Sequence, residues 1–146
     1  MRLYTFCNWY LNSVAQGIQP AHCIHDMFIK YLSATTSTQY KHLIDWAQNH
    51  KTMICLNGGN NAGVNDLYKQ FDEHFKVLGL PYVYFREDME SLNGAMTCVA
   101  IVMPERIYEY AEKVVRGNHT ELEETFTLSS LEKELAQLMA GYSLAR

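Results

Sequence analysis

Four short apolar runs, separated by stretches with helical spacing, constrain the fold of this 146-residue chain more than any other feature. They occupy residues 3–9, 52–56, 81–85 and 95–103, and each has the length and the aromatic or β-branched content of a strand. Strands that alternate with helices predict an α/β architecture, with one sheet of about four mixed, mostly parallel strands. The connection between the last two runs is too short for a helical crossover, so an antiparallel pairing of those strands stays open.

Helical periodicity fills the chain between the expected strands. The clearest stripe consists of Val64, Leu67, Tyr68, Phe71, Phe75 and Leu78. Gly79 follows this stripe and is expected to end the helix. Further along, Ser129 and Glu132 form a capping-box pattern that predicts the start of a final helix.

The length fits a single domain over residues 1–146. Residues 1–116 contain all the expected strands, and residues 117–146 form an acidic connector followed by the final helix. That helix carries a narrow apolar stripe of Leu131, Leu135, Leu138 and Tyr142. The stripe must pack either on the same chain or on a second copy, and we expect a homodimer, the commonest oligomer.

Charge and cysteine usage exclude several classes of protein. Lys and Arg number 12 against 16 Asp and Glu, which gives a net charge of −4 and argues against a dedicated nucleic-acid-binding domain. The longest apolar run, residues 98–103, is too short to span a bilayer, so no membrane partner is expected. The four cysteines are scattered through apolar segments without a CxxC pair. This pattern favours buried thiols in a reducing cytoplasm, with no structural metal and no cofactor.

Polar residues follow the expected strands, where ligands settle in open α/β sheets. Asn8 and Trp9 lie at the end of the first strand, residues 57–61 follow the second, and residues 86–88 follow the third. Trp9 is either a core residue or a surface on which a base stacks. Arg86 either pairs with a phosphate or forms a surface salt bridge with a neighbouring glutamate. The Gly-rich loop of residues 57–63 is either a plain turn or a cradle of backbone N–H groups for an anion.

Two reactive arrangements are also conceivable. His22 and His25 lie one helical turn apart, as metal ligands can, but no third ligand stands at a supportive spacing. A nucleophilic pair of Cys23 or Cys55 with His22 would require a thiol of lowered pKa. Packing roles for these side chains are the simpler interpretation.

Three segments, taken in order, resemble the type 2 peptidyl-tRNA hydrolases. They are residues 16–25 (QGIQPAHCIH), Trp46 with residues 51–56 (KTMICL), and a final element built from residues 79–81, 86–88 and 94–104. The resemblance covers residues 3–116 and implies a hydrolase-like α/β fold.

The departures from that family bear on function. Hydrolases of this kind use a lysine in a Lys-Gly-Lys segment, whereas in this chain the residues that flank the corresponding Gly17 are Gln16 and Ile18. The Asp-Ala-Gly element of the family has become Glu87-Asp88-Met89. Asp88 and Thr97 stand as counterparts of the family's acidic residue and hydroxyl. A site that lacks the lysine suits binding better than ester hydrolysis. We therefore expect no catalytic residue and no metal ligand. The predicted ligand-binding set is Asn8, Trp9, Gln19, His22, Asn57, Asn60, Arg86, Asp88 and Thr97.

The chain is also similar in general character to small phage proteins that sequester nucleotide immune signals. This similarity implies non-catalytic binding of a small nucleotide-derived ligand, of the cyclic ADP-ribose or ADP-ribose type made by a TIR enzyme. Such a sponge would counter bacterial immunity in the host cytoplasm. Two alternatives remain: a hydrolase of peptidyl-tRNA or a related ester, and an interaction module that works through its last helix.

Overall fold

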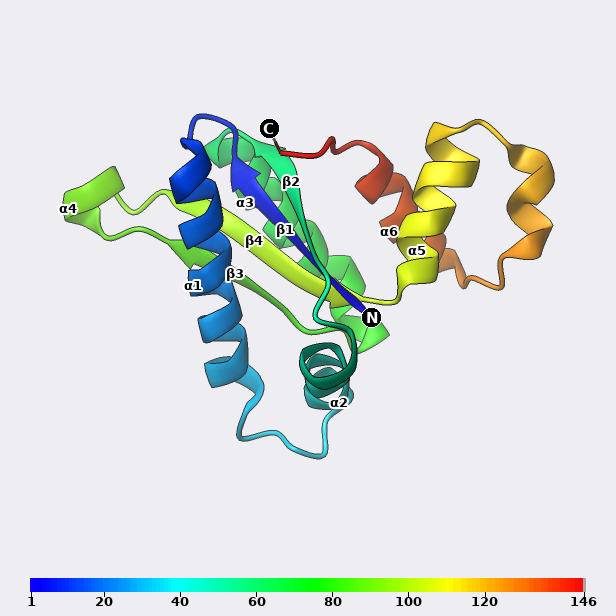
Figure 1. The fold of residues 1–146 in the computed structure, drawn as a ribbon, viewed down its shortest axis with the longest axis horizontal. Coiled ribbons are helices and arrows are strands. Elements are labelled where there is room, and N and C mark those ends of the chain that lie inside the picture. Colours follow the sequence, from blue (N-terminus) through cyan, green and yellow to red (C-terminus); the bar gives the residue numbers. More distant parts are fainter. Residues whose placement is uncertain (146) are drawn as a thin grey trace.

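A four-stranded sheet with the order β2-β1-β4-β3 forms the centre of the molecule (Figure 1). The computed structural model describes residues 1–145. The strands are β1 (Arg2–Asn8), β2 (Met53–Gly59), β3 (Tyr82–Arg86) and β4 (Met96–Met103). β1 pairs with β2 in parallel, and β4 pairs antiparallel with both β1 and β3. The prediction of an α/β fold with four mixed strands is therefore confirmed.

The expectation that the strands pair mostly in parallel needs correction. Three strands run in one direction, but β4 runs against them and lies between β1 and β3, so only one of the three neighbouring pairs is parallel. The short link between β3 and β4 holds only the single-turn helix α4 (Met89–Leu92), which cannot return the chain across the sheet. β4 is one of the two inner strands of the sheet, and all eight of its residues are buried.

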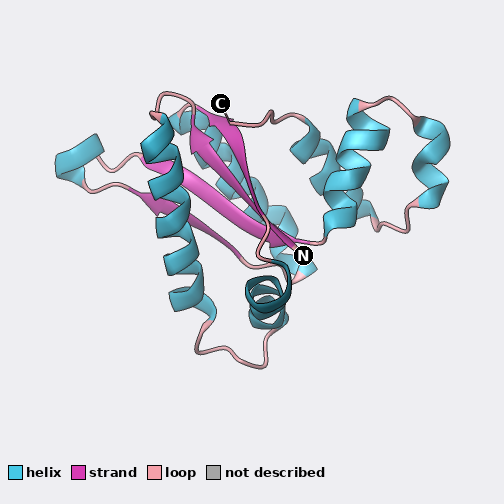
Figure 2. Cartoon of the chain, in the orientation of Figure 1, coloured by secondary structure: helices cyan, strands magenta, loops and turns pink. Residues whose placement is uncertain are grey.

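Helices cover both faces of the sheet (Figure 2). On one face lie α1 (Ser13–Tyr31) and α2 (Thr38–Asp45), and on the other lie α3 (Asn61–Gln70), α5 (Glu105–Tyr110) and α6 (Ser130–Ala140). Side chains of β1 alternate between two cores. The α1-side core includes Leu3, Cys7, Cys23, Met27, Leu43 and Cys98, and the α3-side core includes Tyr4, Phe6, Leu67, Phe71, Ile107 and Met139.

Several helices widen or tighten at their C-terminal ends. π-helical turns follow α2, α3 and α5, at Trp46–His50, Phe71–Phe75 and Ala111–Arg116. Short 3-10 helices occupy Lys76–Leu78 and Thr120–Thr125. The predicted helix that ends at Gly79 is thus continuous and consists of α-helical, π-helical and 3-10 turns in succession. Gly79 ends this helix in the left-handed region, with a φ of 65°, as expected.

The final helix packs on its own chain. The predicted capping box is present: the Ser129 hydroxyl accepts a hydrogen bond from the Glu132 N–H at 3.2 Å, and a Glu132 carboxylate oxygen accepts one from the Ser129 N–H at 2.9 Å. Leu135, Ala136 and Met139 are fully buried in the α3-side core. A dimer is therefore not needed to cover this helix, because the connector before it is long enough to fold the helix back onto the segment that follows α5.

The segment after α6 covers one edge of the sheet. The Asn57 N–H donates to the Ser143 carbonyl at 2.8 Å, and the Ala145 N–H donates to the Cys55 carbonyl at 3.0 Å. Leu144 thereby forms an antiparallel bridge with Leu56 of β2. This isolated bridge occupies backbone groups that would otherwise stand open at a sheet edge. Within residues 1–145, no helix combines the length and apolar character needed to cross a membrane.

Two glycines should respond in opposite ways to a Gly→Ala substitution. At Gly58 an added Cβ would lie 3.0 Å from the Phe6 carbonyl carbon and 3.1 Å from the Cys7 oxygen, so we expect Gly58→Ala to cost about 1–3 kcal/mol. At Gly17, inside α1, nothing lies within 4 Å, so Gly17→Ala should stabilise by up to about 1 kcal/mol. Urea denaturation measures the free energy of unfolding of both variants. Equal changes in this free energy would contradict the close packing at Gly58.

Candidate functional site

The polar residues predicted to form a site gather at one end of the sheet. Because β1, β2 and β3 run in the same direction, their C-terminal ends meet there, beside the start of β4 (Figure 1). Trp9 directly follows β1 and is 63% exposed, so it is not a core residue. The core interpretation of Trp9 is thus excluded, and its role as a stacking surface stays a prediction.

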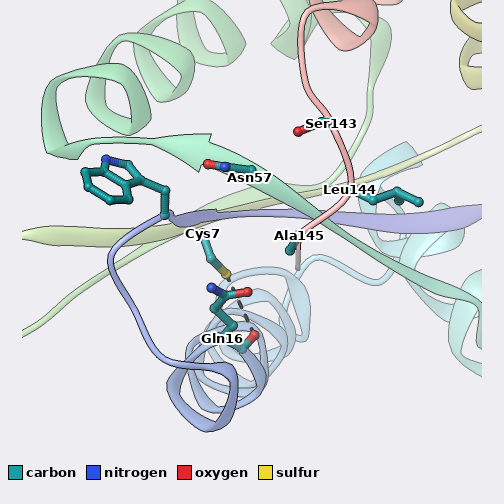
Figure 3. Close-up of a pocket in the computed structure, with 7 residues that line it drawn as sticks. Cys7, Gln16, Asn57, Ser143, Leu144 and Ala145 are labelled. Carbon is teal, nitrogen blue, oxygen red and sulfur yellow. Dashed lines mark hydrogen bonds between the residues drawn. The ribbon is translucent and has the colours of Figure 1, made fainter.

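A cavity of about 360 Å³ opens at this end, between the start of α1 and the ends of β1 and β2. In Figure 3, the Cys7 side chain points from β1 toward Gln16 on α1, and the C-terminal segment passes alongside β2. The cavity is lined by Cys7, Trp9, Gln16, Asn57, Ser143, Leu144 and Ala145. Its volume is at the lower end of the range typical of small-molecule sites.

Neutral hydrogen-bonding groups dominate the cavity wall. Cys7 and Asn57 are register partners in the β1–β2 pair, so both side chains project on the α1 side of the sheet. Gln16 donates through Nε2 to the Leu11 carbonyl at 2.7 Å, and Asn57 accepts through Oδ1 from the Gly59 N–H at 2.9 Å. Among residues 1–145, the side-chain Oε1 of Gln16 and the NH₂ group of Asn57 have no hydrogen-bond partner, so both can bind a ligand.

A second pair of predicted residues lies beside this site. The register passes from Phe85–Cys98 to Arg86–Met96, which makes Thr97 the extra residue of a β-bulge. The bulge turns the Thr97 hydroxyl toward α1, where it donates to Gln19 Oε1 at 2.9 Å. Gln19 in turn donates through Nε2 to Glu87 Oε1 at 2.7 Å. Gln19 and Thr97 are both buried, so these hydrogen bonds join α1 to the sheet and do not face solvent.

Asn8 belongs to a separate network on the α3 side of the sheet. Its Nδ2 lies 2.8 Å from Asn61 Oδ1, 2.7 Å from the Tyr10 hydroxyl and 3.0 Å from the Met96 carbonyl. The Asn8 side chain is fully buried, and among residues 1–145 its Oδ1 has no hydrogen-bond partner. Asn8 therefore joins β1 to α3 and β4, and it does not line the cavity.

Arg86 extends the same α3-side network. Its guanidinium donates to Asn65 Oδ1 at 2.7 Å and to the Gly94 carbonyl at 3.0 Å, and it lies over the Tyr84 ring. The proposed salt bridge to a neighbouring glutamate is not formed. Because Asn65 belongs to α3, Arg86 and Asn57 lie on opposite faces of the sheet. The structure therefore does not bring Arg86 together with Trp9 and Asn57 around one cavity.

Three other predicted site residues have local structural roles. Asn60 is the N-cap of α3 and accepts from the Gly63 N–H at 3.0 Å. Asp88 is the N-cap of α4, and hydrogen bonds from Ser91 hold the pKa of this carboxyl below its usual range. His22 is exposed on α1 and stacks on Phe85 with ring centroids 4.3 Å apart.

The alternative reactive groups do not assemble. No set of three His, Cys, Asp or Glu side chains within residues 1–145 is arranged to hold a metal ion. Cys23 is buried against β4, with its sulfur 3.6 Å from the Cys98 carbonyl, and His22 faces Phe85 instead.

Sequence reasoning therefore found part of the cavity and missed part of it. Trp9 and Asn57 were predicted and line it, whereas the contribution of residues 143–145 was not anticipated. An isolated bridge leaves no periodic signal, because its two residues, Leu56 and Leu144, lie 88 positions apart in the sequence. No protein-family model matches the chain, and no curated protein matches it at a significant level.

Thr97→Val should destabilise the protein more than Thr97→Ser. Valine removes the donor to the buried Gln19 Oε1, and an unsatisfied buried acceptor costs about 1–3 kcal/mol. Serine keeps the hydroxyl and loses one methyl group, worth roughly 0.8 kcal/mol. Urea denaturation of both variants makes the comparison. Equal losses would mean that the hydrogen bond contributes nothing beyond packing.

Proposed function

We propose that this chain binds a small nucleotide-derived ligand in the cavity at the ends of β1 and β2, without transforming it. The observation that carries the proposal is an exposed indole, Trp9, at a cavity whose wall presents the Asn57 NH₂ group and the side-chain Oε1 of Gln16. An aromatic face beside a donor and an acceptor suits a heterocyclic base, which stacks through its plane and hydrogen-bonds through its edge.

The start of α1 supports an anionic ligand. α1 is 19 residues long and has no acidic residue in its first turn. Its N-terminus therefore presents a partial positive charge, favourable for a phosphate, close to Gln16. A volume of about 360 Å³ suits a nucleoside-sized part of the ligand, with the rest lying across the rim.

The state of the polar groups favours binding over hydrolysis. The hydrolase-like resemblance implies a lysine near Gln16, and this chain offers a neutral amide whose NH₂ is held by the Leu11 carbonyl. Asp88, the counterpart of the family's acidic residue, is engaged in capping α4. We therefore favour a cyclic ADP-ribose or ADP-ribose type of ligand that is sequestered, as by a phage sponge acting in the host cytoplasm, over an esterase.

Trp9→Ala should weaken ligand binding, and Arg86→Ala should not. We expect cyclic ADP-ribose or ADP-ribose to bind the unmodified protein in calorimetry. Loss of a base–indole stack, worth about 1–3 kcal/mol, should lower that affinity between about fivefold and a hundredfold. Arg86→Ala is the matched control, because this residue lies on the other face of the sheet. If Arg86→Ala weakens binding and Trp9→Ala does not, the ligand lies on the α3 side. Absence of binding by both nucleotides would refute this ligand class.

The bound ligand should be recovered unchanged. After incubation with a stoichiometric amount of nucleotide, heat denaturation should release the same compound, as measured by chromatography and mass spectrometry. Conversion to a product would instead support the hydrolase alternative. The parallel control uses Trp9→Ala at the same concentration, so that slow solution breakdown is measured separately.

We also propose a homodimer that closes over the cavity mouth. Near Trp9, the start of α1 exposes Val14 (69%) and Ile18 (49%), one helical turn apart. A second copy on this surface would enclose the part of the ligand that the cavity leaves open. Ile18→Asp should then shift the mass measured by light scattering toward the monomer. Ile29→Asp, at a position that is also exposed (63%) but lies at the other end of α1, should not. A monomeric unmodified protein would refute the dimer.

A further inference from the structure

Two cysteine thiols face each other in the centre of the sheet. Cys7 on β1 and Cys98 on β4 are direct register partners in an antiparallel pair, and their sulfur atoms lie 3.4 Å apart. Directly opposed residues of antiparallel strands have Cα atoms about 4.5–5.5 Å apart, within the range of about 4.4–6.8 Å found in disulfides. The backbone is therefore already placed for a cross-link, and the two sulfurs need only approach each other.

One of these thiols also borders the cavity. Cys7 is among the residues that line it, and the Cys7 sulfur lies 3.9 Å from the backbone carbonyl oxygen of Gln16. Cys98 lies behind Cys7 and is enclosed by the core. Cys7 is itself only 1% exposed, but it is the one of the two that lines the cavity, so a small reagent there would meet Cys7 before Cys98.

We propose that Cys7 and Cys98 are an oxidation site, in which a small hydroperoxide that enters the cavity converts the two thiols into a cross-strand disulfide. The Cys7 thiolate attacks the peroxide, so an S–O bond forms and the O–O bond breaks. The proton lost by Cys7 goes to the departing oxygen, which leaves as water or an alcohol. The Cys98 thiol then attacks the Cys7 sulfur, forming the S–S bond while the hydroxyl leaves as water with the Cys98 proton. Two electrons pass in total from the two sulfurs to the peroxide.

The surroundings decide which thiols pair. Cys23 is the nearest competitor, but its sulfur is directed toward the Cys98 carbonyl at 3.6 Å, and it does not line the cavity. Cys55 lies on β2, directly opposite Thr5 of β1, and its side chain is partly exposed. Burial raises the pKa of Cys98, so the second step should accelerate as the pH rises, because more of this thiol is then ionised.

The experiment treats the folded protein with hydrogen peroxide and then alkylates the remaining thiols. We expect a product with two fewer alkylated cysteines, a Cys7–Cys98 link in the non-reducing peptide map, and full reversal by dithiothreitol. The yield should fall at least tenfold in Cys7→Ser and in Cys98→Ser, and should be unchanged in the matched control Cys55→Ser. Formation should be faster at pH 9 than at pH 7.

The peptide map of the unmodified protein decides the question even if a serine variant fails to fold. A dominant link between Cys7 and Cys23 or between Cys98 and Cys23, an intermolecular link through Cys55, or irreversible oxidation of Cys7 with Cys98 still free would each overturn the proposal. Protein unfolded in urea provides the reference, because pairing there no longer depends on the β1–β4 register. No nucleotide is present, so the result is independent of the proposed ligand.

Discussion

The burial of β4 over its whole length is the constraint on which the rest of the structure depends. A strand whose eight residues are all inaccessible must have a neighbour on each side and a layer on each face. β1 and β3 supply the neighbours, α1 covers one face, and α3 with the segment after α5 covers the other. The antiparallel direction of β4 follows from its short link to β3. As a consequence, the ends of three strands meet at one end of the sheet, where the cavity forms.

The alternation of side chains along β1 divides that end of the sheet into two chemically different sites. Cys7 projects toward α1 and borders the cavity, whereas Asn8, the next residue, projects toward α3 and joins Asn61. A shift of one position thus separates a ligand-accessible wall from a buried polar network. Arg86 falls on the network side, where Asn65 and the Gly94 carbonyl already occupy its guanidinium. The residues that line the cavity are therefore neutral.

Local patterns in the sequence were sufficient for the elements but not for all of their partners. The stripe that ends at Gly79 and the capping box at Ser129 act over a few residues, so both could be predicted. The central place of β4 depends on which strands it pairs with, and the pairing of Leu144 with Leu56 joins residues far apart in sequence. Asn60 and Asp88 show a different difficulty. A polar residue after a strand can bind a ligand or cap the following helix, and spacing alone does not separate the two roles.

The two walls of the cavity differ in how firmly they are held. On one side, Cys7 lies in the buried centre of the sheet, and nearby the bulge at Thr97 is joined to α1 by a buried hydrogen bond. On the other side, residues 143–145 are attached to β2 by two backbone hydrogen bonds, each worth about 0.5–1.5 kcal/mol, while Leu144 remains 59% exposed. A segment held so weakly opens at low free-energy cost, whereas the core strands open only on global unfolding. The size of the cavity is therefore set by residues 143–145, and a ligand that contacts Ser143 would gain affinity by holding that segment in place.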